Sequence, residues 1–289
     1  MSRIGLVLEG GGMRGAYTAG ILDRFIEEDI EFDYVIGVSA GANNGINFVT
    51  KQKGRSKRIF LHWSQDKRFL SFNNILRERS YFGMDFIFDK LPNELERFDY
   101  EAFEKSPVVF RACASNCDTG KAEYFDRVHF SPKEYMDRAL RASSSLPIIS
   151  PSVRVLEYRY LDGVMTDPIP IERSINDGND YNVVILTKKQ EQLKKLSLMD
   201  RFLVNLTKTI YPKLKDSINI STHKYNESLT YVSELRDQGK VFLFKPNKRL
   251  LASRYVKDSN SIEAVYGAGY NDAKSKINEL KSWISEINE

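Results

Sequence analysis

The sequence predicts an α/β protein of three layers, in which helices cover both faces of a mainly parallel central sheet. Short apolar segments alternate with longer amphipathic stretches along the 289 residues, and this alternation is typical of such sheets. A glycine-rich loop, Gly10–Gly15, follows the first apolar segment, and a Gly-x-Ser-x-Gly sequence, Gly37–Gly41, follows the second. Both motifs therefore lie at strand carboxyl ends, where open α/β sheets form their binding crevices.

The strands are predicted from short apolar or alternating runs, and the helices from apolar positions that recur at helical spacing. Strands are expected at Ile4–Leu8, Tyr34–Val38, Val108–Ala114, Ala122–Phe125, Arg154–Leu161, Asn182–Leu186 and Val241–Phe244. Helices are expected at Ala16–Glu28, Lys133–Ala142 and Ser261–Ile287. No linker rich in Gly, Ser or Pro divides the chain, so we expect one domain over residues 1–289. A basic, partly helical segment (188–230) and a C-terminal helix (261–287) are expected to pack onto it.

The pentapeptide Gly37-Val38-Ser39-Ala40-Gly41 is typical of a nucleophile elbow. In such a turn the serine has a strained backbone, and the flanking positions are glycine because a Cβ there would collide with the neighbouring strand or helix. The pattern also arises in ordinary strand-to-helix turns, so the elbow alone does not decide the function. Ser39 is the candidate nucleophile of a serine acyl hydrolase.

The glycine-rich loop Gly10-Gly11-Gly12-Met13-Arg14-Gly15 can supply an oxyanion hole. Backbone N–H groups aimed at the developing negative charge contribute about 3 kcal/mol each to transition-state stabilisation. Arg14 and the positive end of the following helix favour an anionic group as well.

The same loop fits the dinucleotide-binding pattern G-x-G-x-x-G, so a nucleotide-binding protein is an alternative. That pattern expects an acidic residue at the end of the second strand. Here the second strand ends in Gly37-Val38-Ser39, and the nearest acidic residues precede it. The hydrolase interpretation is favoured, because it finds its nucleophile at that position.

A serine hydroxyl needs a base to remove its proton. The three histidines, His62, His129 and His223, lie beside no glycine or carboxylate motif and are predicted to be surface or packing residues. Asp162 is the better candidate, because it ends a strand-like run and is followed by Gly163, which permits close approach. A turn aspartate that caps the next segment is the alternative for this residue.

Together these blocks resemble the patatin-like phospholipase family in order and spacing. Arg141–Pro151 is similar to the serine and proline stretch that precedes the catalytic aspartate of that family. The likeness covers roughly residues 4–187. The short bacterial members are the most similar ones, as Tyr160–Gly163 and Asp167–Pro170 indicate.

The resemblance implies a Ser–Asp dyad that acts on acyl esters of glycerolipids through an acyl-enzyme, with no histidine, metal or cofactor. By position, Ser39 would be the nucleophile and Asp162 the general base. Gly11, Gly12 and Met13 would form the oxyanion hole, with Arg14 at its edge. The family usually has Gly or Ala where this chain has Val164, and a branched residue disfavours a positive φ there. A non-catalytic lipid-binding or regulatory relative is therefore the main alternative.

Composition agrees with a cytoplasmic enzyme. The chain is 42% hydrophobic, its net charge is +4, and no nucleic-acid motif accompanies its basic residues. Cys113 and Cys117 have no nearby histidine pair, so a reduced, buried role is predicted for them rather than a zinc site. Neither a signal peptide nor an apolar run of about 20 residues is recognisable.

Two segments bear on the substrate, and each has two interpretations. Phe60–Phe88 is rich in aromatic and aliphatic residues, which either line an acyl groove or, as is expected for most of them, pack in the core. Lys188–Lys215 carries eight Lys and Arg residues against Glu191 and Asp200. A basic amphipathic helix there would either contact an anionic membrane peripherally or cover the sheet as a solvated helix.

Overall fold

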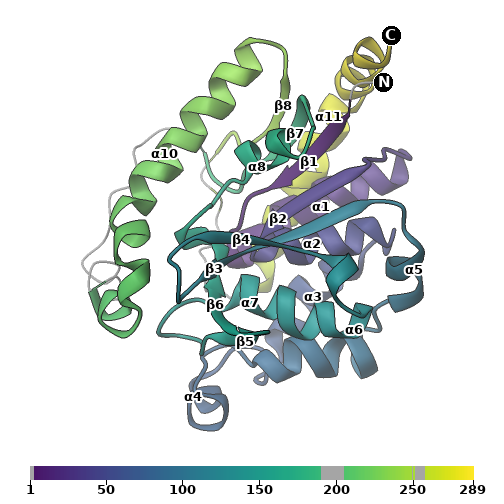
Figure 1. Cartoon of the computed structure of the whole chain (residues 1–289). Coiled ribbons are helices and arrows are strands. Elements are labelled where there is room, and N and C mark those ends of the chain that lie inside the picture. The colour runs from purple at the N-terminus through teal and green to yellow at the C-terminus, as the bar shows by residue number, and fades with distance from the viewer. Residues whose placement is uncertain (1–2, 190–204, 249, 251–257) are drawn as a thin grey trace.

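The computed structural model of the chain describes residues 3–189, 205–248, 250 and 258–289, apart from the side chains of residues 219–221. Its centre is an eight-stranded sheet with helices on both faces (Figure 1). The strand order is β5-β6-β3-β2-β1-β7-β8, and β4 pairs with β3 outside this path. The predicted α/β class with a mainly parallel central sheet is therefore confirmed.

The parallel part of the sheet is built from strands that were predicted in the sequence. These strands are β1 (Ile4–Leu8), β2 (Tyr34–Val38), β3 (Val109–Asn116), β7 (Tyr181–Ile185) and β8 (Val241–Phe244). β1 lies between β2 and β7, and both pairings are parallel. The buried residues of these central strands are nearly all apolar, as expected for a sheet covered on both faces.

The other strands run antiparallel at one side of the sheet. β4 (Ala122–Asp126) and β6 (Tyr158–Asp162) both pair with β3, and β5 (Val153–Val155) pairs with β6. The single strand expected at Arg154–Leu161 is wrong, because the chain turns between β5 and β6. Leu156 has a φ of 52° in this turn, a conformation that leucine rarely adopts and that no glycine marks in the sequence.

One face of the sheet packs against α1 (Gly15–Glu27), α2 (Ala40–Val49) and α11 (Ser259–Asn288) (Figure 1). Leu6, Leu8 and Phe244 point from their strands into this core. The opposite face packs against α8 (Ile171–Asn176) and α10 (Lys215–Asp237). Because strand side chains alternate in direction, the intervening residues form that second core.

The C-terminal helix α11 is fitted closely to α1. A Cβ on Gly20 of α1 would lie 2.2 Å from the Tyr266 carbonyl oxygen, and one on Gly269 of α11 would lie 2.0 Å from that of Tyr17. Tyr17 and Tyr266 also donate hydrogen bonds of 2.7 Å across the interface, to Asp272 and Asp23. The two backbones can approach this closely because both crossing positions are glycine.

The shorter helices lie between the strands. They are α3 (Arg55–Leu61), η2 (Trp63–Gln65), α4 (Phe72–Glu78), η3 (Phe86–Leu95), α5 (Tyr100–Lys105), η4 (Arg127–His129), α6 (Pro132–Glu134), η5 (Tyr135–Leu140), α7 (Arg141–Ser144) and η7 (Pro212–Leu214). The consecutive elements α6, η5 and α7 form the helix predicted at Lys133–Ala142. Much of the basic segment 188–215, including Lys194, Lys195 and Arg201, lies outside the described residues.

Candidate active site

Ser39 occupies a sharp turn between β2 and α2. Its φ of 55° and ψ of −123° lie in a region that is essentially reserved for glycine. A Cβ on Gly37 would lie 2.6 Å from the Ala42 nitrogen, and one on Gly41 would lie 2.5 Å from the Leu8 carbonyl oxygen. The backbone thus has the geometry expected of a nucleophile elbow, with the strained serine half-buried between two obligatory glycines.

The glycine-rich loop lies directly against this elbow. A Cβ on Gly10 would be 3.2 Å from the Cβ of Ser39. Gly12 has a φ of 57° and begins the 3-10 turn η1 (Gly12–Arg14), which leads into α1. The first N–H groups of such a turn have no partner within it, so they are free to face a ligand. Gly12 and Met13 line the same pocket as Ser39.

A buried carboxylate, Glu9, directly precedes the glycine-rich loop. Its Oε2 accepts the Thr187 N–H at 2.6 Å, and its Oε1 accepts the Tyr225 hydroxyl at 3.0 Å and lies 3.2 Å from Lys188 Nζ. Burial alone would raise the pKa of Glu9, but Lys188, the Thr187 amide and Arg14 lower it, and the resulting pKa is below the ordinary 4.5. Glu9 is therefore held as an anion directly before the three glycines.

Asp162 is placed beside the elbow by strand β3. Val38, the last residue of β2, pairs with Cys113, and Asp162, the last residue of β6, pairs with Ala114. β4 occupies the opposite edge of β3 over both stretches, so β2 and β6 share one edge and meet end to end. Ser39 and Asp162 are therefore neighbours, although 122 residues separate them in the sequence.

The serine-rich stretch at the end of α7 joins these two residues. The Ser39 N–H donates to Ser143 Oγ at 2.9 Å, and the Asp162 N–H donates to the Ser145 carbonyl at 2.8 Å. Asn43 donates to the Ser39 carbonyl at 2.9 Å and to Ser144 Oγ at 2.8 Å. The backbones at both ends of the candidate dyad are thus fixed by one short segment.

The turn after Asp162 accommodates Val164 without strain. Asp162 is completely buried, and its Oδ1 accepts the Val164 N–H at 3.0 Å. Val164 lies in the 3-10 turn η6 (Gly163–Met165) and does not have a positive φ. Gly163 is the residue that the turn requires, because a Cβ there would lie 2.5 Å from the Cys113 carbonyl oxygen.

Ser39 opens into an apolar cavity of about 120 Å³. Many of its walls come from the segment that runs from α3 to η3. They include Phe60, Phe69, Phe82, Met84, Ile87 and Phe88. Other apolar residues of the same segment, such as Leu70 and Phe86, are buried in the core. Most of the named lining residues also belong to that buried core, as was expected for this segment, and the acyl groove stays a prediction.

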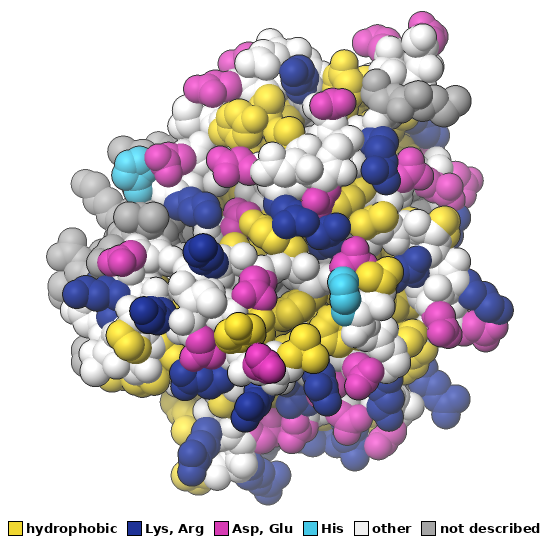
Figure 2. Space-filling model, in the orientation of Figure 1, with side chains coloured by type: hydrophobic (Ala, Val, Ile, Leu, Met, Phe, Trp, Pro, Cys, Tyr) yellow, Lys and Arg dark blue, Asp and Glu magenta, His cyan; other side chains and the backbone are white. Residues whose placement is uncertain are grey.

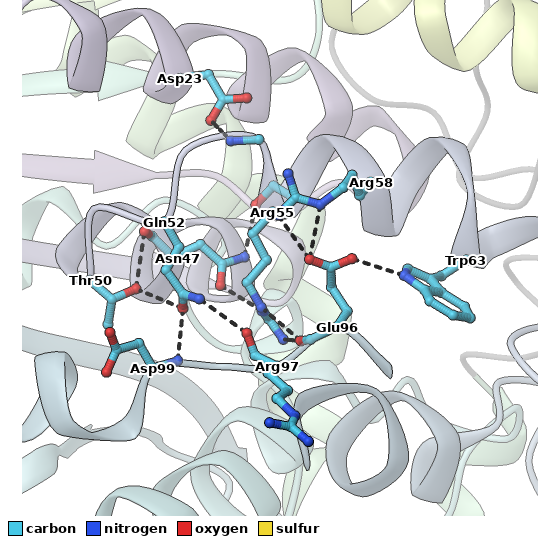
Figure 3. A network of polar contacts seen from close by, with 12 residues as sticks. Asp23, Asn47, Thr50, Gln52, Arg55, Arg58, Trp63, Glu96, Arg97 and Asp99 are labelled. Atoms are coloured by element: carbon cyan, nitrogen blue, oxygen red, sulfur yellow. Dashed lines mark hydrogen bonds and ion pairs between the residues drawn. The ribbon is translucent and has the colours of Figure 1, made fainter. Parts of the chain in front are cut away.

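Two lining residues of this cavity, Asn47 and Arg55, belong to a network of polar contacts (Figure 3). The cavity follows α2 for about 10 Å, because Ala40 and Asn47, which both line it, are seven residues apart in a helix. Arg55 also lines it and donates to Asn47 Oδ1 at 2.7 Å and to the Glu96 carbonyl at 2.8 Å. The Glu96 carboxylate accepts the Trp63 indole N–H at 3.0 Å. Burial lowers the pKa of Arg55 to about 10, which leaves it a cation at neutral pH.

The histidines and cysteines lie apart from this site. His62, His129 and His223, all within the described part of the chain, are exposed and do not line the cavity. Cys113 and Cys117 are free and buried, and burial raises the pKa of the Cys117 thiol to about 12. Among the described residues no three His, Cys, Asp or Glu side chains gather where they could hold a metal ion, and no helix is long and apolar enough to cross a membrane.

The structure gathers Ser39, Asp162, Gly12 and Met13 at one place. Gly11 and Arg14 belong to the same loop but do not line the cavity, since a Cβ on Gly11 would face Thr187 at 2.8 Å. Sequence reasoning missed the supporting roles of Glu9, Asn43 and Ser143. The serines at 143–145 were recognised as part of a block, but no local pattern indicates which backbone groups they bind.

Comparison with known families agrees with this geometry. The model of the patatin-like phospholipase family matches residues 6–175, and the chain belongs to this family. A second model, described as a domain of unknown function (DUF6363), matches residues 211–285, which include the edge strand β8 and most of α11.

Among individual proteins, the chain is 32% identical over 189 residues to the uncharacterized protein YjjU of Escherichia coli (strain K12). That match covers 64% of this chain and 52% of YjjU, so it spans about half of the relative's length. A probable lipid hydrolase, 463L of Invertebrate iridescent virus 6, is 25% identical over 239 residues, which are 73% of this chain and 81% of that protein. The crystal structure of VipD from Legionella pneumophila has the same fold, with a TM-score of 0.51, 12% identity, and coverage of 95% of this chain and 67% of that one.

Proposed function

We propose that the protein is a serine acyl hydrolase that cleaves acyl ester bonds of lipids, with phospholipids as the expected class of substrate. The observation that carries the proposal is the strained backbone of Ser39, beside the buried Asp162 and at the mouth of an apolar cavity. The family of the chain and its likeness to the probable lipid hydrolase of the iridescent virus support it.

In the proposed reaction Ser39 Oγ attacks the carbonyl carbon of the ester while its proton passes to Asp162. The negative charge that develops on the carbonyl oxygen is stabilised by backbone N–H groups, for which Gly12 and Met13 are best placed. When the tetrahedral intermediate collapses, the ester C–O bond breaks and the leaving alcohol takes the proton from Asp162. Water then attacks the acyl-enzyme, Asp162 accepts its proton, and the fatty acid leaves as Ser39 regains a proton.

The burial of Asp162 suits this role. A carboxylate has a reference pKa near 4 and is a weak base in water, and burial makes it a better proton acceptor. A histidine is not needed in this scheme, in agreement with the exposed positions of all three. The alternative, a non-catalytic lipid-binding relative, was based on an expected distortion of this turn by Val164. The Val164 N–H donates a hydrogen bond to Asp162, so the expected distortion is not observed.

The membrane contact expected from the basic segment 188–215 stays a proposal, because much of that segment lies outside the described residues. Within the part that is described, Lys188 is engaged with the buried Glu9. The cytoplasmic location and the single-domain organisation stay predictions as well. For the latter, the pairing of β8 with β7 and the packing of α11 on α1 are the supporting contacts.

The proposal is tested by the hydrolysis of a soluble short-chain p-nitrophenyl ester and of a phospholipid in mixed micelles. We expect Ser39→Ala to abolish turnover of both, and Asp162→Asn to lower kcat by a factor of about 10² to 10⁴, the usual contribution of a general base. His223→Ala is the matched control and should be fully active, because His223 is exposed. Loss of activity in His223→Ala, or full activity in Asp162→Asn, would contradict the proposed dyad.

A further inference from the structure

The short helix α4 exposes an apolar face to solvent. The side chains of Phe72, Ile75 and Leu76 are 76%, 44% and 88% exposed. Their spacing of three and four residues places them on the same side of the helix. α4 projects from one end of the molecule in Figure 1, and Figure 2 shows hydrophobic and basic side chains side by side at that end. Three large apolar residues in one turn of helix form a patch of the kind that marks an interaction site.

The orientation of this face is fixed by the inner side of α4. Asn74 is 6% exposed, and its side-chain amide donates to the Arg68 carbonyl at 3.0 Å and to the Tyr81 carbonyl at 3.4 Å. The Ser71 N–H donates to the Tyr81 carbonyl at 3.1 Å. Because these hydrogen bonds hold the polar side of α4 against the segments that flank it, the apolar side has to face outward.

The segments that flank α4 line part of the apolar cavity. Leu70 and Phe82 pair as an isolated β-bridge, and Phe82 and the neighbouring Phe69 both line the cavity that Ser39 opens into. The Tyr81 N–H donates to the Ile149 carbonyl at 2.7 Å, and this bond connects the segment after α4 to the segment that leads to Asp162. The exposed face and the cavity therefore belong to one continuous structural unit.

Cationic residues flank the apolar face on both sides in the sequence. Between residues 66 and 79 the cationic residues are Lys67, Arg68, Arg77 and Arg79, and the acidic ones are Asp66 and Glu78. All four cations are exposed, and Arg68 pairs with Asp66 at 2.6 Å. An apolar face flanked by exposed cations complements the interface of an anionic bilayer, where acyl chains lie beneath negatively charged headgroups.

We propose that α4 docks the protein on the surface of anionic phospholipid bilayers, with the cavity mouth held near the lipid. The functional benefit of docking rests on the proposed lipid hydrolysis, because docking shortens the path of an acyl chain from the bilayer to Ser39. It assigns the membrane contact to α4 rather than to the basic segment 188–215. The docking itself requires no catalysis, so it is measured separately from turnover.

The test uses the full chain carrying Ser39→Ala, which prevents lipid turnover, and sedimentation with vesicles of phosphatidylcholine and phosphatidylglycerol. Phe72→Ser combined with Leu76→Ser removes the two most exposed side chains of this face, neither of which belongs to the buried core. We expect this pair to lower the vesicle partition coefficient about tenfold or more, because one buried Phe or Leu side chain is worth at least one tenfold step in affinity. Val128→Ser is the matched control, because Val128 is also 76% exposed but lies in η4.

Turnover is compared in parallel in the protein that retains Ser39. Phe72→Ser with Leu76→Ser should leave hydrolysis of the soluble ester unchanged and reduce hydrolysis of vesicle phospholipid. Unchanged vesicle binding in this variant would overturn the docking proposal, even if ester hydrolysis is normal. The same holds if binding is lost only on charge reversal of Lys194 and Lys195. Binding that depends on α4, together with a wild type that hydrolyses neither substrate, would instead support docking and contradict the proposed function.

Discussion

The backbone of Ser39 stores strain, and replacing this residue by glycine should release it. A non-glycine residue in such a region costs about 1–3 kcal/mol, and Ser39 has a φ of 55° and a ψ of −123°. Ser39→Ala retains that strain and Ser39→Gly does not, while both lack the hydroxyl group. The difference between the two variants therefore isolates the backbone.

The expected magnitude follows from two opposing effects. Ser39→Gly gains stability because the strain is released. It loses about 0.4–1 kcal/mol of stability because glycine increases the entropy of the unfolded chain. Ser39→Gly should therefore be more stable than Ser39→Ala by about 0.5–2 kcal/mol. For a chain of this size the difference corresponds to an increase in Tm of about 1–3 °C.

Thermal unfolding followed by calorimetry or circular dichroism measures this difference. Ala40→Gly serves as the control, because Ala40 is the first residue of α2 and has ordinary helical geometry. This control should lose up to about 1 kcal/mol, as glycine usually does in a helix. If Ser39→Gly is less stable than Ser39→Ala by a similar amount, the elbow is not strained and the reasoning fails.

Further predictions concern the residues that support the site. Gly41→Ala should destabilise the protein by about 1–3 kcal/mol and slow the reaction of Ser39 with a fluorophosphonate, because the new Cβ would lie 2.5 Å from a main-chain oxygen. Gly267→Ala, where no atom lies within 4 Å, should be neutral or stabilising, and a Tm scan compares the two. Glu9→Gln should cost about 2–3 kcal/mol at pH 7, since bonds to a buried carboxylate are lost. Because the pKa of Glu9 is lowered from 4.5 on folding, its contribution is fully present above about pH 4.5. The Tm difference from wild type should therefore shrink as the pH falls through the folded-state pKa, and a constant difference would contradict this account. Arg55→Ala should destabilise by about 3 kcal/mol and shift ester preference toward longer acyl chains, because it removes the donor to Asn47 and a side chain that lines the cavity. An ester chain-length series measures that shift, and an unchanged preference would show that the cavity does not bind the acyl chain.

The parts of the fold that could be predicted from the sequence are those with a local cause. The elbow at Ser39 is one of them, because its glycines are required by contacts within a few residues or with the adjacent strand. The parallel strands were predicted equally well, since their apolar runs are buried on both faces. The turn at Leu156 was missed because a leucine with a φ of 52° leaves no glycine, proline or asparagine as a signal.

The assembly of the site depends on contacts between distant parts of the chain. Ser39 and Asp162 meet because β6 continues along the edge of β3 where β2 ends, and no local pattern encodes this pairing. Glu9 has partners that follow it by 178 residues or more. The exposed face of α4 was also missed, because Phe72 and Leu76 were grouped with the surrounding apolar residues that do pack inside.

The central claim is that Ser39 is an activated nucleophile whose base is Asp162. It is tested most directly by the intact mass of the protein after exposure to a fluorophosphonate, with Ser39→Ala and Asp162→Asn treated in parallel. The account predicts one adduct on the wild type, none on Ser39→Ala, and much slower labelling of Asp162→Asn. A folded wild type that remains unlabelled, or Asp162→Asn that is labelled as fast as the wild type, would contradict it.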